Sequence, residues 1–145
     1  MIDIHIRKVG YAGRITLQRP DALNAMKYDM CLQIDAALRN WKHDDGVKCV
    51  VIDALGERAF CAGGDIADLY ATGMAGDYRY GQKFWAEEYL TNSLIAAFPK
   101  PYNALMQGLT MGGGDGISCH GSHRIVGESS QIAMPECGIG LVPDV

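Results

Sequence analysis

Hydrophobic and polar residues alternate at the start of the chain. Isoleucine occupies positions 2, 4 and 6, and a second alternating run over residues 11–18 contains Ile15 and Leu17. An alternation of period two is typical of a strand that buries one face. Glycines at positions 10 and 13 lie around the junction of the two runs and favour a turn. Residues 2–9 and 11–18 are therefore predicted to form a hairpin.

After an Arg-Pro-Asp break at positions 19–21, the hydrophobic spacing changes to that of a helix. The apolar residues that recur at this spacing are Met30, Ile34, Leu38 and Trp41. They predict a helix over residues 24–42, for which Asn24 is a suitable N-cap. The apolar run over residues 47–54 is typical of a strand buried on both faces. This order of strand, helix and buried strand indicates a crossover in an α/β fold.

The rest of the chain continues to alternate between helical and strand-like segments. We expect helices over residues 65–70, 77–98 and 115–120, a strand over residues 102–107, and short strands over residues 124–126 and 131–133. Loops are expected over residues 56–64, 72–76 and 108–114 and from residue 134 onward, because glycine and proline are frequent there. The pattern predicts a single α/β domain over residues 1–145.

The composition excludes several classes of protein. With 48% hydrophobic and 21% charged residues, the chain resembles an ordinary globular domain. A net charge of -4 without a concentrated basic face argues against nucleic acid as a partner. No segment reaches the roughly 20 apolar residues that a membrane span requires. The N-terminus resembles neither a secretory signal nor an Arg-rich transit peptide, so we expect a cytoplasmic protein. Five cysteines without a C-x-x-C pair favour neither a disulfide framework nor a metal site.

Two glycine-rich turns, residues 62–65 (Ala-Gly-Gly-Asp) and 112–114 (Gly-Gly-Gly), each follow a strand-like segment. Glycine lets backbone N–H groups approach a ligand closely, and a turn that opens a helix leaves N–H groups unpaired. Two such turns side by side would supply two donors to one carbonyl oxygen, which is an oxyanion hole. Tight packing explains either turn alone equally well. Neither turn is a phosphate loop, because no Gly-Lys-Ser/Thr follows.

Several short motifs occur in a characteristic order. They are Arg19-Pro20, Leu23-Asn24-Ala25, residues 59–66 (AFCAGGDI), Pro99-Lys100-Pro101, residues 111–114 (MGGG) and Pro135-Glu136. In this order and spacing, the chain resembles the enoyl-CoA hydratase/isomerase (crotonase) superfamily over nearly its whole length. The resemblance implies a crotonase-like α/β fold of repeated ββα units, truncated before the C-terminal helical region. Residues 1–145 would then be a partial acyl-CoA-binding domain.

The resemblance also implies which residues meet the substrate. The backbone N–H groups of Ala62 and Gly113 would hold the thioester carbonyl, and Gly64, Asp65 and Ile66 would line the pantetheine and adenine side. Asp65 is an equally good candidate for the N-cap of the next helix. Coenzyme A enters as part of the substrate, and neither a metal nor another cofactor is implied.

The carboxylates distinguish the branches of this superfamily. Its hydratases carry one glutamate shortly after the glycine triplet, at a position that is Gly116 here, and another that corresponds to Glu136. Adding water across a double bond uses two carboxylates, so the missing one argues against simple hydration. The remaining pattern is most similar to the 3-hydroxyisobutyryl-CoA hydrolase subfamily, in residues 110–114 (TMGGG), 133–136 (AMPE) and 139–145 (IGLVPDV).

That subfamily implies hydrolysis of a short 3-hydroxyacyl-CoA thioester, from branched amino-acid (valine) catabolism. Glu136 would be the main catalytic carboxylate, acting as nucleophile or as base for water. Asp144 would bind the 3-hydroxyl of the substrate or assist proton transfer, and Glu88 would contribute to substrate binding, with Glu87 as an equal competitor. Two plainer interpretations stay open: Glu136 as a surface loop carboxylate and Asp144 as a frayed residue.

Two other classes of function also stay open. The chain is alternatively a non-catalytic remnant or assembly subunit that keeps part of the CoA site. A hydratase or double-bond isomerase would need a substitute for the carboxylate missing at Gly116. None of the four histidines is expected to be catalytic, because the sequence places no partner beside them. The partners implied are an acyl-CoA and either further copies of the chain or a missing C-terminal segment.

Overall fold

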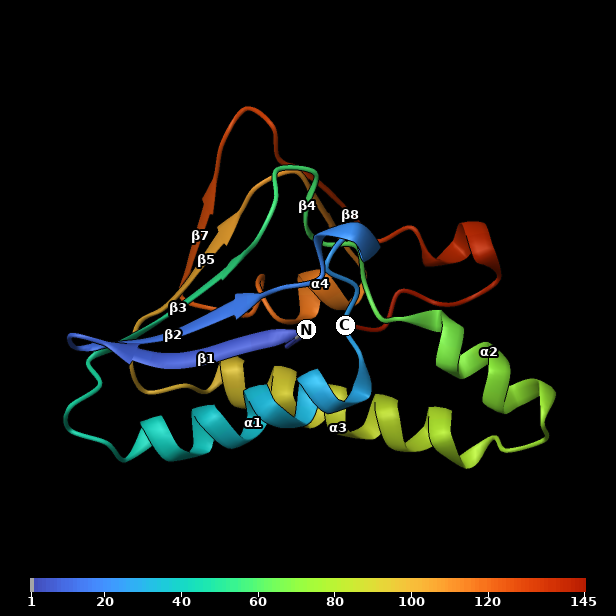
Figure 1. The fold of residues 1–145 in the computed structure, drawn as a ribbon, viewed down its shortest axis with the longest axis horizontal. Helices are drawn as coiled ribbons and strands as arrows, with labels where there is room; N and C mark the ends of the chain where they lie inside the picture. The colour runs from blue at the N-terminus through green and yellow to red at the C-terminus, as the bar shows by residue number, and fades with distance from the viewer. Residues whose placement is uncertain (1) are drawn as a thin grey trace.

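The computed structural model describes residues 2–145 and shows a five-stranded sheet that begins with the predicted hairpin (Figure 1). In spatial order its strands are β1 (Ile4–Val9), β2 (Ala12–Leu17), β3 (Cys49–Ala54), β5 (Tyr102–Met106) and β7 (His123–Val126). β1 and β2 pair antiparallel, whereas every other pair in this sheet is parallel. The helical crossover predicted between β2 and β3 is confirmed, because these strands are parallel neighbours joined through a helix.

A second sheet contains three very short parallel strands. They are β4 (Ala59–Cys61), β6 (Leu109–Met111) and β8 (Gln131–Ala133), in this spatial order. β3 and β4, β5 and β6, and β7 and β8 are consecutive in the chain, and each pair contributes one strand to each sheet. This is the repeated ββα arrangement that the sequence resemblance implies. The prediction of loops at β4 and β6 was wrong, because strands of three residues are too short to show a periodicity.

The four α-helices occupy the predicted regions with different bounds, whereas the two 3₁₀ helices lie in segments that were predicted not to be helical. They are α1 (Tyr28–Lys42), α2 (Ile66–Met74), α3 (Arg79–Ala96), the single turn α4 (Gly113–Gly116), and the 3₁₀ helices η1 (Pro20–Ala22) and η2 (Glu136–Ile139). α2 runs beyond residue 70 into the segment expected to be a flexible loop, and α4 ends before residue 120. Helix ends are the least certain part of any sequence-based assignment, because several residue types are tolerated there.

Asn24 does not cap α1, contrary to the prediction. The N-cap position is Lys27, and Asn24 lies before it in a left-handed conformation with φ of 54°. Its buried side chain donates to the carbonyl oxygens of Leu55 and Ala59, both at 2.9 Å, and accepts from the N–H of Arg19 at 2.8 Å. Asn24 therefore connects the segment after β2 to the segment between β3 and β4.

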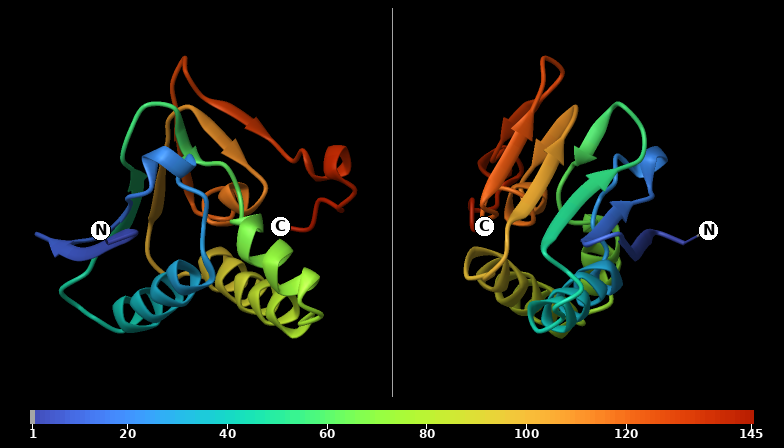
Figure 2. Two further views of the ribbon diagram at one scale, coloured as in Figure 1. Left: turned by 45° about the vertical axis from the view of Figure 1, so that its right-hand side comes forward. Right: turned by 90° about the vertical axis from the view of Figure 1, so that its left-hand side faces the viewer.

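α1 and α3 lie side by side beneath the sheets (Figure 2). The apolar face of α1 is buried as its spacing predicts, and the ring of Trp41 packs against β2 where Gly13 leaves room for it: a Cβ on Gly13 would lie 2.5 Å from the ring. β3 buries Val50 and Ile52 completely, but its other face is only partly covered, so the prediction of burial on both faces was wrong. None of the helices within residues 2–145 combines the length and apolar character that membrane crossing requires.

Candidate functional site

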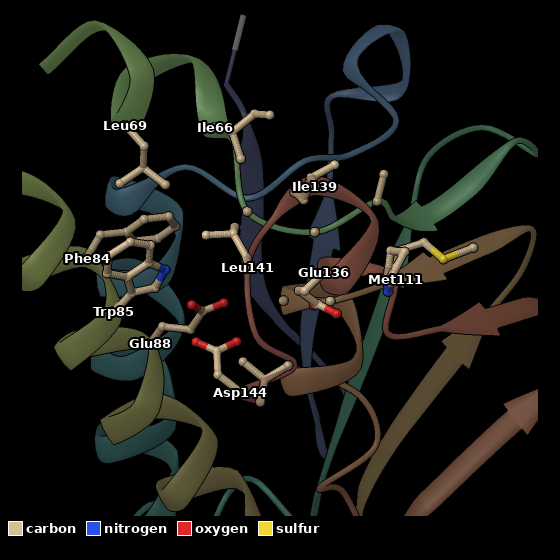
Figure 3. A pocket seen from close by; sticks show the side chains of 17 residues that line it. Ile66, Leu69, Phe84, Trp85, Glu88, Met111, Glu136, Ile139, Leu141 and Asp144 are labelled. Carbon is tan, nitrogen blue, oxygen red and sulfur yellow. The ribbon is translucent and has the colours of Figure 1, made fainter. Parts of the chain in front are cut away.

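A cavity of about 250 Å³ lies where distant segments of the chain meet (Figure 3). Its walls come from residues 62–64, the first turns of α2, the middle of α3, residues 111–113, η2 and the C-terminal residues. β4 and β6 are parallel neighbours, and parallel strands end at the same edge of a sheet. For this reason the two glycine-rich turns that follow β4 and β6 lie against one another, as the sequence predicts.

Three carboxylates line this cavity: Glu88 from α3, Glu136 from η2 and Asp144 from the C-terminal segment. Figure 3 shows the Glu88 and Asp144 carboxylates next to each other, with Glu136 on the neighbouring wall. Glu88 is 4% exposed and Glu136 9% exposed, so neither is a surface charge. The interpretation of Glu136 as a solvated loop residue was therefore wrong, and Asp144 is placed at the cavity wall. Glu87 is absent from the residues that line the cavity among those described.

Two carboxylates lie directly against the second glycine turn. A Cβ placed on Gly112 would lie 2.6 Å from Oε1 of Glu136, and a Cβ on Gly113 would lie 2.5 Å from Oε1 of Glu88. Gly112 also has φ of 50°, which side chains other than glycine rarely adopt. Glycine at both positions therefore lets the acids approach the backbone of the turn.

The free backbone donors differ from the expected pair. The N–H of Ala62 is not available, because it donates to the carbonyl oxygen of Leu23 at 3.0 Å. The same loop pairs with Met26, which donates to Gly63 and accepts from Asp65, both at 2.8 Å. This parallel bridge leaves the N–H of the intervening residue directed away from Met26.

That intervening residue is Gly64, and its N–H has no acceptor within residues 2–145. The N–H of Gly113 at the start of α4 likewise has no partner there. A Cβ on Gly113 would lie only 3.2 Å from the nitrogen of Gly64, so the two donors are neighbours on the cavity wall. The structure thus replaces Ala62 by Gly64 as the candidate partner of Gly113.

Burial, helped by nearby negative charge, raises the pKa of two acids in this region, Glu88 and Asp115. Burial, together with the negative charges of Asp144 and Glu136, raises the pKa of Glu88 to about 7. Burial also raises the pKa of Asp115 to about 6, and the charge of Glu136 adds to this effect. Neither Lys nor Arg lines the cavity among the residues that the structure describes. The cavity is therefore suited to holding a proton on Glu88 near neutral pH.

The position where hydratases carry their first glutamate is closed. A Cβ on Gly116 would lie 2.7 Å from Nδ2 of Asn92, a buried side chain of α3. Asp115, the neighbouring acid, does not line the cavity, and its Oδ1 accepts from the thiol of Cys119 at 3.6 Å. The carboxylate that the sequence lacks at this position is therefore not supplied by Asp115.

Asp65 has a structural task. Its side chain accepts from the N–H of Ala67 at 3.1 Å, which makes it the N-cap of α2, and it pairs with the guanidinium of Arg19 at 2.8 Å. The capping interpretation is confirmed. Asp65 is not part of the cavity wall, whereas Gly64 and Ile66, predicted beside it, are. Its predicted role toward the substrate stays a prediction.

An apolar wall faces the carboxylates, and most of it escaped the sequence-based prediction. Its members are Ile66, Leu69, Phe84, Trp85, Ile139 and Leu141 (Figure 3). The helical spacing that places Phe84 and Trp85 on the same face as Glu88 was the available signal, but nothing local marked Leu69 or Ile139. The histidines do not line the cavity, and no cluster of three or more metal-binding side chains occurs in the described chain.

The chain is similar in sequence to known proteins. The family model for enoyl-CoA hydratase/isomerase matches residues 12–145. Over 143 residues, the chain is 48% identical to the mitochondrial 3-hydroxyisobutyryl-CoA hydrolase of Danio rerio and 42% identical to that of Homo sapiens. The match covers 99% of this chain but only 37% of each relative. These relatives are mitochondrial by name, so they do not support the predicted cytoplasmic location.

Solved structures carry the same fold. An enoyl-CoA hydratase from Rhodobacter sphaeroides superposes with a TM-score of 0.97 at 65% identity, covering 99% of this chain and 42% of that one. A carnitinyl-CoA dehydratase from Mycobacterium thermoresistibile superposes with a TM-score of 0.95 at 40% identity, covering 98% of this chain and 42% of that one. By sequence, by fold and by the glycine turns that meet at its cavity, the chain belongs to the enoyl-CoA hydratase/isomerase family.

Proposed function

We propose that the protein hydrolyses a short 3-hydroxyacyl-CoA thioester, such as 3-hydroxyisobutyryl-CoA. The observation that carries this proposal is the meeting of Glu136, Glu88 and Asp144 at two unpaired backbone donors, with no carboxylate available at Gly116. The identity to proteins named 3-hydroxyisobutyryl-CoA hydrolase supports the choice of thioester. A role in valine breakdown is part of the same proposal.

In this proposal the N–H groups of Gly64 and Gly113 hold the thioester oxygen. Attack on the carbonyl carbon moves negative charge onto that oxygen, and preorganised donors stabilise this charge most when water is excluded. Glu136 attacks the carbon itself or removes a proton from the attacking water. Collapse of the tetrahedral intermediate breaks the C–S bond, and the thiolate of coenzyme A leaves and takes up a proton. If Glu136 is the nucleophile, the acyl group remains on its carboxylate as an anhydride, and water then hydrolyses this anhydride to free the acid and regenerate Glu136. Water is consumed, and free coenzyme A and the hydroxy acid are the products.

Glu88 supplies a proton to the leaving group, and Asp144 binds the acyl group. With a pKa of about 7, Glu88 exists in both protonation states near neutral pH, which suits an acid that donates a proton to the leaving thiolate. Asp144 accepts a hydrogen bond from the 3-hydroxyl of the substrate. The apolar wall packs against the hydrocarbon part of the acyl group.

The size of the cavity favours a small acyl group. At about 250 Å³ it is slightly smaller than the ~300–1,000 Å³ of typical ligand pockets. It therefore holds the acyl end of the thioester, with the rest of coenzyme A extending past Ile66 into solvent. Coenzyme A is part of the substrate, and the proposed reaction requires no further cofactor.

Product analysis by mass spectrometry tests the proposal directly. The purified protein is incubated with 3-hydroxyisobutyryl-CoA beside its Glu136→Gln variant, which keeps the shape of the side chain but removes its charge. We expect free coenzyme A and 3-hydroxyisobutyrate from the parent protein and neither product from the variant. An unchanged thioester, or equal release by both proteins, would refute hydrolysis through Glu136.

A hydratase is the second candidate, and one observation favours it. Glu88 and Glu136 both lie against the glycine turn, so Glu88 would replace the glutamate that is missing at Gly116. The 65% identical structure is named an enoyl-CoA hydratase. Incubation with crotonyl-CoA distinguishes the two candidates. A product heavier by one water with an intact thioester indicates hydration, whereas hydrolysis of the hydroxyacyl thioester alone excludes it.

The edge strands β7 and β8 are candidate contact surfaces for the predicted partners. All residues of β7 and β8 are exposed, including the apolar Ile125, Val126 and Ile132. Exposed edge strands favour pairing with further strands. We therefore propose that further copies of the chain, or an additional segment of polypeptide, cover these edges. Light scattering coupled to size-exclusion chromatography measures the number of copies in the assembly. A monomeric protein would exclude further copies and leave an additional segment of polypeptide as the proposed cover.

A further inference from the structure

Asp144 lies on a segment that few interactions hold in place. In the chain from residue 2 to residue 145, the backbone of residues 142–145 makes no hydrogen bond, and these residues belong to neither a helix nor a strand. Two other carboxyl groups, those of Glu88 and Glu136, line the same cavity as Asp144. Like charges at close range repel one another. Without another interaction, the Asp144 carboxylate would be driven toward the solvent.

Tyr89 supplies that interaction. Its hydroxyl donates a hydrogen bond to Oδ2 of Asp144, and it is the only side chain within the described residues that bonds to this carboxylate. Tyr89 follows Glu88 in α3, a helix of 18 residues anchored by buried side chains such as Phe84 and Ile95. The partner of Asp144 is therefore fixed to a rigid element, although Asp144 itself is not.

Tyr89 remains a hydrogen-bond donor over the whole physiological range. Partial burial, together with the bond to Asp144 and the negative charge of that carboxylate, raises the pKa of Tyr89 to about 12. Tyr89 is not among the residues that line the cavity, and the residue is 42% exposed. It contacts Asp144 from outside, so it has no direct contact with an acyl group in the cavity.

We infer that Tyr89 is a positioning residue that makes the site selective for acyl groups with a 3-hydroxyl. The Tyr89 hydroxyl occupies Oδ2 of Asp144 and holds the carboxylate at the cavity wall, which leaves Oδ1 to accept from the substrate hydroxyl. A carboxylate has enough acceptor capacity for both bonds. This inference rests on the proposed binding of 3-hydroxyacyl-CoA thioesters at this site.

Binding of two thioesters that differ by one hydroxyl tests the inference. Dissociation constants of 3-hydroxyisobutyryl-CoA and isobutyryl-CoA are measured by isothermal titration calorimetry, under conditions and times at which both remain intact. The proteins compared are the parent, Tyr89→Phe, Asp144→Asn and the double variant. Tyr11→Phe is the matched control, because Tyr11 is exposed and belongs to the β1–β2 hairpin, away from the cavity.

We expect the parent to prefer the hydroxylated thioester and Tyr89→Phe to reduce this preference about tenfold, equivalent to about 1.4 kcal/mol. Affinity for isobutyryl-CoA should change little, and Tyr11→Phe should behave as the parent. In the Asp144→Asn background, Tyr89→Phe should have no further effect, because the interaction is already lost. A purely structural role would weaken the binding of both thioesters alike.

An unchanged preference in Tyr89→Phe, or an equal effect of Tyr89→Phe with and without Asp144, would overturn the inference. Absence of any preference in the parent would overturn it as well. The proposed hydrolysis fails separately: if the hydroxylated thioester binds with the expected preference but is never cleaved, selection through Tyr89 stands and the reaction assigned to the site is wrong.

Discussion

Replacing Glu88 by glutamine is expected to make the folded protein more stable at pH 8 but not at pH 4.5. The folded environment raises the pKa of Glu88 from 4.5 to about 7, because burial and two nearby carboxylates disfavour the charged form. Between these values the folded state binds a proton that the unfolded state has lost. The contribution of Glu88 to stability is therefore fully present below pH 4.5 and is lost as the pH rises through 7.

The magnitude follows from the size of the shift. Each unit of pKa difference corresponds to about 1.4 kcal/mol, so ionising Glu88 in the fold costs on the order of 3 kcal/mol at pH 8. With only 4% of the residue exposed, solvent screening reduces this value little. The raised pKa of Asp115 contributes a pH dependence of the same sign, but it is common to both proteins and cancels in the difference.

Urea unfolding curves recorded between about pH 4.5 and 8.5 measure this difference. We expect the free energy of unfolding of the parent to fall relative to that of Glu88→Gln as the pH rises, by on the order of 3 kcal/mol in total. Glu87→Gln is the control, because Glu87 is the adjacent residue of α3 and does not line the cavity. If the free energies of unfolding of the parent and Glu88→Gln changed in parallel with pH, the reasoning would be refuted. A larger effect of Glu87→Gln would show that Glu87, not Glu88, has the raised pKa.

Three further substitutions test other parts of the structure. Gly113→Ala places a Cβ 2.5 Å from Oε1 of Glu88 beside the oxyanion donors; we expect kcat for thioester hydrolysis to fall about 10²–10³-fold, measured by release of free thiol. Asn24→Ala removes the three hydrogen bonds of a buried side chain and should lower the free energy of unfolding in urea by about 2–4 kcal/mol; a loss below about 1 kcal/mol would contradict this role. Asp65→Ala removes the N-cap of α2 and the partner of Arg19; we expect about 1 kcal/mol of destabilisation, and Asp65→Asn should retain most of the cap in the same assay.

Much of the fold is encoded locally and was predictable. The alternating isoleucines of β1 and the helical spacing of the apolar residues in α1 report a buried face directly, because side-chain direction repeats with the period of the element. The glycines at 112 and 113 correctly predicted a turn whose backbone other groups approach closely. In the structure, a Cβ at either position would overlap a carboxylate oxygen. The absence of a carboxylate at position 116 could be predicted from the sequence, because it depends only on the identity of that residue, which is glycine.

Other features depend on contacts between distant parts of the chain. β4 and β6 become strands through pairing in the second sheet, and Asn24 leaves the helix because carbonyl groups near β4 accept its hydrogen bonds. In the first glycine turn, the carbonyl oxygen of Leu23 accepts from the N–H of Ala62, whereas the pairing of the turn with Met26 leaves the N–H of Gly64 free.

The sequence by itself determined the family, the glycine turns and the acids Glu136 and Asp144 as candidates, since these are short motifs of residue type and spacing. Only the tertiary structure decided that Glu88 rather than Glu87 enters the cavity and that Tyr89 bonds to Asp144, 55 positions away. The physical reason is distance along the chain. Local patterns are set by neighbouring residues, whereas a cavity, its unpaired donors and its perturbed acids exist only once remote segments exclude water between them.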